Sequence, residues 1–247
     1  MHASGEGAGE SGVSAGAAPD ALRIGLAQIE HNLNEGRYRP GPWERYIREL
    51  KRHPAAARAA LARDVSRVSR KLHLRAPRKT ISVRAAVALE LGAIVLGALL
   101  LAFSGRESSL VLGLAGACLW IMSSQPIVKI SAAAMFGVGY EYAYLLRGEP
   151  RFKMRFGDYV AAPRSARVIL HLCGTIGSPL GAWAAARMIR ATLPGTATVI
   201  MAAFWILIAI NAAAFAAGLA GIRRMGSIRT AEGSGGAAGL ELREARA

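Results

Sequence analysis

This chain of 247 residues lacks the short motifs that mark the common hydrolases and phosphoryl-transfer enzymes. It contains no HExxH zinc motif, no GxSxG nucleophile elbow and no P-loop. It also lacks paired aspartates of the kind that hold magnesium for pyrophosphate chemistry. The sequence therefore predicts no metal site and no cofactor, and it identifies no catalytic residue.

Cysteines and acidic residues are also scarce. The two cysteines, Cys118 and Cys173, fall inside apolar stretches, where a thiol is usually a small packing residue. Acidic residues number 16 against 31 basic ones, so the formal net charge is +15. This charge would suit nucleic acid, but the Lys and Arg residues flank the apolar stretches, as in proteins whose basic segments meet anionic lipid. Nucleic acid is therefore not the expected partner.

Long apolar runs are what the sequence has in excess. Hydrophobic residues make up 53% of the chain, the mean hydropathy is +0.29, and the apolar tracts are 85–103, 110–146 and 168–222. About 18 apolar residues are enough to cross roughly 30 Å of hydrocarbon as a helix. We therefore expect an all-α membrane protein with four transmembrane helices, at about 85–103, 110–129, 168–186 and 197–222.

The tract 110–146 is too long for one span, because a single helix would extend for about 55 Å. Gln125-Pro126 and Lys129 supply a natural break. We expect the second span to end near Lys129 and residues 131–146 to lie along the cytoplasmic interface. Two half-helices that form a re-entrant hairpin are the alternative.

The chain before the first span is polar and basic. Residues 1–19 are rich in Gly, Ala and Ser and predict a disordered tail, as do residues 223–247. Between them and the membrane domain (81–222), residues 20–80 predict three amphipathic cytoplasmic helices. These helices could rest on the inner leaflet with their apolar faces down, pack as a bundle with a partner, or simply expose an ordinary solvated face.

Basic residues predict the orientation. Residues 1–84 carry 16 Lys and Arg, the connection 147–167 carries six, and the tail from 221 carries five. The opposite side of the four spans carries only three, at Arg106, Arg187 and Arg190. Because cytoplasmic loops are enriched in Lys and Arg, we expect an inner-membrane protein with both termini in the cytoplasm.

Four polar residues lie within or at the ends of the apolar tracts at a similar depth: Glu90, Gln125, Lys129 and His171. A charge in hydrocarbon is costly and normally faces a partner inside the bundle. Glu90 paired with Lys129 or His171 would neutralise that charge and fix the helix register. The alternative is a polar pocket, open to the cytoplasm, that moves a proton or holds a polar head group.

The connection 147–167 is the second candidate site. Between Arg151 and Phe156, basic and apolar residues alternate with period two, so an extended segment would direct its cations to one side. Arginine binds phosphate through two parallel hydrogen bonds. The residues predicted to bind phosphate or lipid head groups are Arg147, Arg151, Lys153, Arg155, Arg164 and Arg167.

These features support three hypotheses. The first is a non-enzymatic multi-pass protein whose basic cytoplasmic face binds anionic lipid or a protein partner. The second is an enzyme or carrier that acts on a phosphate-bearing lipid at the cytoplasmic leaflet. The third is a small proton-coupled transporter, oligomeric because four helices leave little room for a pathway.

Overall fold

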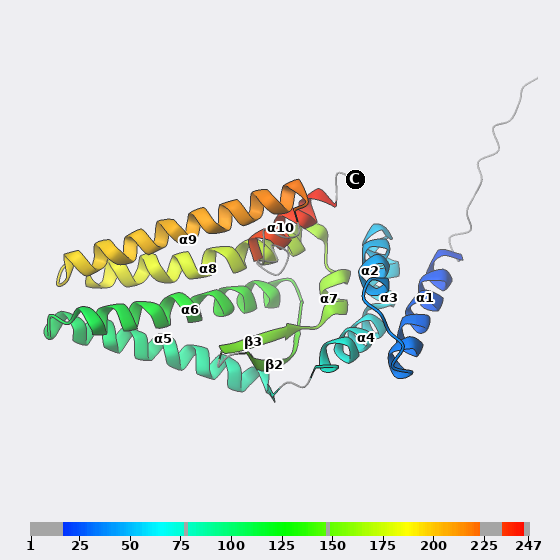
Figure 1. The fold of residues 1–247 in the computed structure, drawn as a ribbon, viewed down its shortest axis with the longest axis horizontal. Helices are drawn as coiled ribbons and strands as arrows, with labels where there is room; N and C mark the ends of the chain where they lie inside the picture. Colours follow the sequence, from blue (N-terminus) through cyan, green and yellow to red (C-terminus); the bar gives the residue numbers. More distant parts are fainter. Residues whose placement is uncertain (1–16, 77–78, 147–148, 223–233, 245–247) are drawn as a thin grey trace, which may run out of the picture.

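The computed structural model describes residues 17–76, 79–146, 149–222 and 234–244. Four long helices lie side by side, short N-terminal helices lie beyond one end of them, and a small β-sheet lies between these two groups (Figure 1). The candidate sites described below are all at this junction.

The long helices are α5 (Val83–Arg106), α6 (Leu110–Met135), α8 (Arg164–Ile189) and α9 (Pro194–Ala220). Each is long and apolar enough to cross a membrane, which confirms the four helices predicted from the apolar tracts. Short turns join α5 to α6 and α8 to α9 at one end of the bundle, which we call the turn end. The opposite end, beside the β-sheet, is the sheet end.

Helix α8 lies at the centre of the bundle, between α6 and α9 (Figure 1). In its apolar span, 56% of the residues are buried inside the protein, against 6% for α9. Helix α9 exposes large side chains such as Val199, Trp205 and Ile206. Because so much apolar surface would be unfavourable in water, this exposure suits a hydrocarbon environment.

Helices α5 and α6 touch in their turn-end halves and diverge toward the sheet end (Figure 1). At the contact, a Cβ on Gly97 would lie 2.9 Å from the carbonyl oxygen of Gly116, so the two backbones meet directly. The indole of Trp120 donates to the carbonyl of Ile94 (2.7 Å) one turn nearer the sheet end. Beyond this bridge the helices separate and leave space between them.

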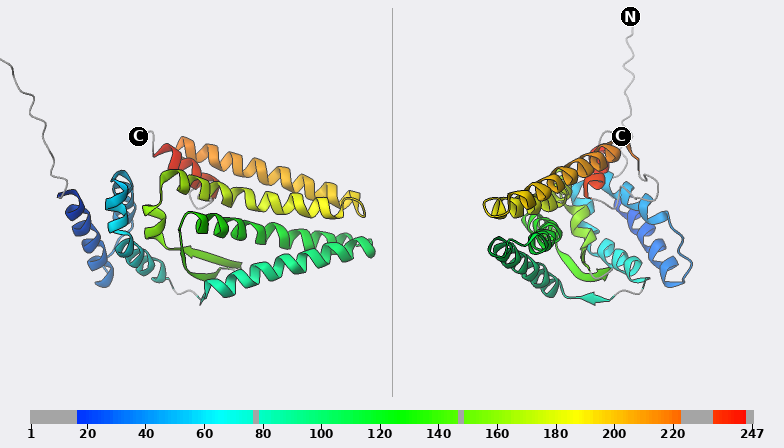
Figure 2. Two further views of the ribbon diagram at one scale, coloured as in Figure 1. Left: turned by 180° about the vertical axis from the view of Figure 1, so that it is seen from behind. Right: turned by 60° about the vertical axis from the view of Figure 1, so that its left-hand side comes forward.

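A three-stranded antiparallel sheet lies between the separated ends of α5 and α6 (Figures 1 and 2). Its strands are β1 (Thr80–Ile81), β2 (Tyr140–Leu146) and β3 (Glu149–Met154), in the order β1-β2-β3. Tyr144 is opposite Thr80 on one side and Arg151 on the other, and the register shifts between Tyr140 and Tyr142. The sequence analysis did not predict this sheet within its all-α class.

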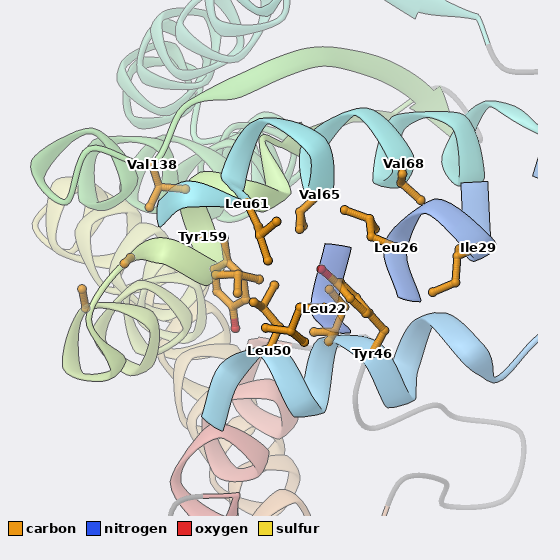
Figure 3. Close-up of a cluster of buried hydrophobic side chains, with 14 of the residues drawn as sticks. Leu22, Leu26, Ile29, Tyr46, Leu50, Leu61, Val65, Val68, Val138 and Tyr159 are labelled. Carbon is orange, nitrogen blue, oxygen red and sulfur yellow. The ribbon is translucent and has the colours of Figure 1, made fainter. Parts of the chain in front are cut away.

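The N-terminal unit consists of α1 (Ala17–Asn34), α2 (Pro42–Arg52), α3 (Ala55–Ala60), α4 (Ala62–Leu74) and α7 (Phe156–Ala161). Their apolar side chains point into one core, in which Leu50, Leu61 and Val65 are almost completely buried (Figure 3). Helix α7 packs so closely that a Cβ on Gly157 would overlap the carbonyl of Ala62. The Gly157 N–H donates to the Ser66 hydroxyl (2.9 Å).

The prediction that the N-terminal apolar faces could rest on the inner leaflet is wrong. These faces bury one another, and α7 of the same chain completes the core. An apolar stripe on a single helix is unfavourable in water, and packing the stripes against one another removes all of them from water. The predicted third helix is also divided, because Leu61 lies between α3 and α4.

The predicted break at Gln125-Pro126 is also wrong, since α6 continues through Lys129 to Met135. Membrane helices tolerate proline where neighbouring elements support the freed backbone groups. The last turn of α6 packs on the N-terminal unit, where Ala133 is fully buried. Residues 131–146 are therefore neither an interfacial helix nor half of a re-entrant hairpin. They complete α6 and form β2, whose alternating tyrosines favour a strand.

The predicted disorder of residues 223–247 is wrong for α10 (Ser234–Arg243), which lies against α8 and α9 (Figures 1 and 2). Small residues in α10 permit this close packing, and Glu241 reaches buried cations. Residues 223–233 and 245–247 lie outside the described residues. So does most of the predicted N-terminal tail, and α1 already begins at Ala17.

Replacing Gly157 with alanine tests the insertion of α7 into the N-terminal unit. The new Cβ would overlap the Ala62 carbonyl, so we expect Gly157→Ala to reduce the stability by about 1–3 kcal/mol, the usual effect of overpacking. Gly25→Ala is the matched control, because its Cβ would meet Tyr46 at an ordinary 3.7 Å. Thermal unfolding of the purified proteins measures both, and equal melting temperatures would contradict the close packing.

Candidate functional site

A cavity of about 720 Å³ lies where α5 and α6 diverge beside the sheet, and we call it the sheet-end cavity. Its polar wall includes Glu90, Gln125, Lys129, Tyr140, Arg151 and Ser234. Its apolar wall includes Leu89 and Met122, which are both exposed on the outer surface of the bundle. The cavity is therefore amphipathic, and its apolar side meets the surface that suits lipid.

Two groups in the polar wall lack a protein partner in the described part of the chain. Lys129 forms no ion pair there, and its aliphatic stem packs near Gly174 of α8. The buried hydroxyl of Tyr140 has no hydrogen-bond partner among the described residues. Burial raises the pKa of Tyr140 well above its usual range, so the phenol keeps its proton and remains a donor. An ammonium and a phenol are both donors, so this wall is suited to an anion.

The predicted intramembrane cluster is only partly assembled. Glu90, Gln125 and Lys129 line the sheet-end cavity, whereas His171 lies outside it, with Nε2 2.9 Å from the hydroxyl of Tyr159. The pairing of Glu90 with Lys129 or His171 stays a prediction. Helix α6 lies between α5, which carries Glu90, and α8, which carries His171 (Figure 1).

The six predicted phosphate ligands do not form one basin. The extended segment is confirmed for residues 151–154 as part of β3, and Arg151 lines the sheet-end cavity. Lys153, in contrast, donates to the Ser69 hydroxyl (2.7 Å) of the N-terminal unit, and burial lowers its pKa. Arg155 lies 3.4 Å from Asp158. The chain turns into α7 after β3, which separates these cations from Arg164 and Arg167.

The last two predicted cations, Arg164 and Arg167, meet α10, and Arg147 lies outside the described residues. Arg164 donates to the backbone carbonyl of Leu242 (3.2 Å). Arg167 is only 4% exposed, and its Nε donates to Oε2 of Glu241 (3.1 Å). One of its terminal nitrogens donates to the carbonyl of Ala162 (2.8 Å). The guanidinium thus joins α8 to both α7 and α10.

Glu241 receives two more donors on its other oxygen. The Tyr159 hydroxyl donates to Oε1 at 2.5 Å, and Lys51 forms an ion pair with the same atom. Lys51 also lies 3.3 Å from Glu244. We call Lys51, Tyr159, Arg167 and Glu241 the Glu241 cluster. It joins α2, α7, α8 and α10 at the sheet end.

The charged side chains of the Glu241 cluster determine which of its groups carry a proton. Burial alone would raise the pKa of Glu241, but Lys51 and Arg167 outweigh it and lower that pKa to about 2. Burial and the adjacent carboxylate raise the pKa of Tyr159 well above its usual value. Because the one phenolic hydrogen goes to Glu241, Nε2 of His171 must be the donor to Tyr159. The buried Nδ1 of His171 has no partner among the described residues.

Sequence reasoning missed several residues of these sites, chiefly Tyr140, Tyr159, Lys51 and Glu241. The alternation of tyrosines in 140–144, followed by that of 151–156, could have predicted a hairpin and hence the position of Tyr140. No local signal joins Lys51 to Glu241, which are 190 positions apart. In the described parts of the chain, no three His, Cys, Asp or Glu side chains are grouped to hold a metal ion.

Acid should weaken the Glu241 cluster. A carboxylate whose pKa is lowered from 4.5 to about 2 adds stability above pH 4.5, on the order of 3 kcal/mol, and this stability is lost as the pH falls toward 2. We expect the melting temperature of Glu241→Gln to lie below that of the wild type at pH 6. The difference should shrink below pH 4.5, and a difference independent of pH would exclude an ionised Glu241. The exposed Glu49→Gln is the control.

Comparison with known proteins gave no match: no protein-family model, no curated protein and no solved structure is significantly similar to this chain.

Proposed function

We propose that this chain is a multi-pass inner-membrane protein that binds an anionic phospholipid of the cytoplasmic leaflet in its sheet-end cavity. The observation that carries this proposal is the composition of the cavity walls. Among the described residues, Lys129 forms no ion pair and the Tyr140 hydroxyl no hydrogen bond on one side of the cavity. Leu89 and Met122, on the other side, belong to the exposed apolar surface that suits lipid.

A phospholipid matches this arrangement in both of its parts. Its phosphate is an acceptor that charge-assisted hydrogen bonds from Lys129 and Arg151 would neutralise. Its acyl chains would continue past Leu89 and Met122 into the bilayer without leaving hydrocarbon. The volume of about 720 Å³ lies within the range of ordinary small-molecule sites, which supports a head group as the occupant.

The distribution of charge supports a cytoplasmic sheet end. The N-terminal unit and the segments on either side of α7 carry most of the Lys and Arg residues, whereas Arg106, Arg187 and Arg190 lie near the turn end. Under the positive-inside rule, the sheet-end cavity then opens at the cytoplasmic leaflet, where anionic lipid is enriched. No reaction is proposed, because His171, the expected partner of Glu90, lies outside the cavity.

Cysteine labelling tests the orientation. In a background with Cys118→Ala and Cys173→Ala, Ala191→Cys at the turn end should react with an impermeant thiol reagent in intact cells. Pro40→Cys in the N-terminal unit should react only after permeabilisation. Both positions are exposed, and neither substitution changes the charge. Reaction of Pro40→Cys from outside would reverse the proposed orientation.

Removing the donors of the cavity tests the lipid site. We expect Lys129→Met to lower the amount of phosphatidylglycerol retained by the purified protein by at least about tenfold, since a hydrogen bond to a charged group contributes about 1.5–3 kcal/mol. Tyr140→Phe should give a smaller loss. Native mass spectrometry of the protein from mixed phosphatidylglycerol and phosphatidylcholine nanodiscs measures both.

Arg187→Met is the matched control, because it removes one exposed cation at the turn end. It should leave the retained lipid unchanged. If Lys129→Met and Arg187→Met reduce phosphatidylglycerol equally, the net charge of the protein, and not the sheet-end cavity, holds the lipid.

A further inference from the structure

The Glu241 cluster resembles an anion-binding site in which the bound anion is the carboxylate of Glu241 from the same chain. Three donors on three different helices, Lys51, Tyr159 and Arg167, converge on the two oxygens of one carboxylate. Only 4% of the surface of Arg167 is exposed, and only 18% of the Lys51 side chain is exposed. Burial of this kind is costly for cations unless an anion is present.

The cations exceed the negative charge that α10 supplies. Arg58 lies next to Arg167, and both donate to the carbonyls of Val160 and Ala162 at the end of α7. Burial and Arg167 lower the pKa of Arg58, as expected where like charges crowd together. Glu241 pairs with Lys51 and Arg167, and Glu244 lies 3.3 Å from Lys51, so two carboxylates face the three cations Lys51, Arg58 and Arg167. A phosphate, with three acceptor oxygens and a charge of about −1.5 to −2, would neutralise this group more completely.

The helix that brings Glu241 to these cations is intrinsically weak. It has ten residues, of which Gly235, Gly236 and Gly239 are glycines. Each glycine reduces the stability of a helix interior by about 1 kcal/mol relative to alanine, and helices this short are marginal in water. The helix therefore depends on its contacts with α8 and α9 and on the anchored carboxylate. A carboxylate carried by such a helix can be displaced by a competing anion.

We propose that Lys51, Tyr159 and Arg167 form a phosphate-binding site, and that Glu241 of α10 occupies it as a tethered competitor. Phosphate binding then releases α10 from α8 and α9. The phosphate is either free or the head group of a lipid with a terminal phosphomonoester, and both offer the same oxygens to the three donors. No residue of the Glu241 cluster lines the sheet-end cavity, although Ser234 of α10 does, and the phosphate site does not require the proposed lipid binding there.

Release of α10 is measured with a thiol on its buried face. Ala238 is completely buried and does not line the sheet-end cavity, so Ala238→Cys, in full-length protein without Cys118 and Cys173, should react slowly with a maleimide. In nanodiscs of phosphatidylcholine, inorganic phosphate should accelerate the reaction several-fold. A tethered competitor acts at an effective concentration on the order of millimolar, so phosphate is added at millimolar concentration. Sodium chloride of equal ionic strength is the control.

Direct binding is measured by calorimetry with inorganic phosphate. Glu241→Gln removes the competing charge, so the apparent Kd for phosphate should fall at least about tenfold relative to the wild type. Adding Arg167→Gln to Glu241→Gln should abolish this gain. Nanodiscs that contain phosphatidic acid distinguish the sources, because acceleration of labelling there without added phosphate identifies the lipid head group as the ligand.

The proposal is overturned if neither inorganic phosphate nor phosphatidic acid accelerates the labelling of Ala238→Cys. It is equally overturned if sodium chloride gives the same acceleration, since α10 would then respond to ionic strength alone. The labelling assay keeps Glu241 intact, so it decides the matter even if Glu241→Gln proves too unstable to purify.

Discussion

The guanidinium of Arg167 joins three parts of this structure at the sheet end. It lies in the first turn of α8, the most buried of the four long helices, and donates both to the end of α7 and to Glu241. Helix α7 belongs to the core of the N-terminal unit, so one buried charge joins that unit, the bundle and α10. A buried cation that loses its partners destabilises a protein by several kcal/mol, which makes these contacts mutually dependent.

The sheet-end cavity has a different origin, in the geometry of two helices that are close at one end only. Direct backbone contact at Gly97 and Gly116 draws α5 and α6 together, and the sheet separates them further along. The space is lined by both apolar and polar groups, because the divergence begins within the apolar span and ends beside the strands. The cavity and the Glu241 cluster share no residue, although α10 contributes Ser234 to the first and Glu241 to the second.

The sequence predicted what depends on local composition and missed what depends on distant partners. Four spans followed from apolar length, and the extended form of 151–154 followed from alternation. The continuation of α6 through Pro126 and the burial of Ala133 could not be predicted, because elements remote in sequence support α6 there. Glycine-rich composition suggested disorder in the C-terminal tail, yet the same small residues let α10 pack closely once Glu241 finds Arg167. Glu90 and His171 matched in estimated depth, but depth says nothing about which helices are neighbours.

The insertion of α7 into the N-terminal unit has a consequence for biosynthesis. Helices α1–α4 leave the ribosome first, but Gly157 and Tyr159, which complete their core, follow only after α5 and α6. Domains usually fold as units in order of synthesis, and this one is an exception. Its apolar stripes stay incomplete until α5 and α6 have been synthesised. A chain truncated before α7 would therefore keep part of this core exposed.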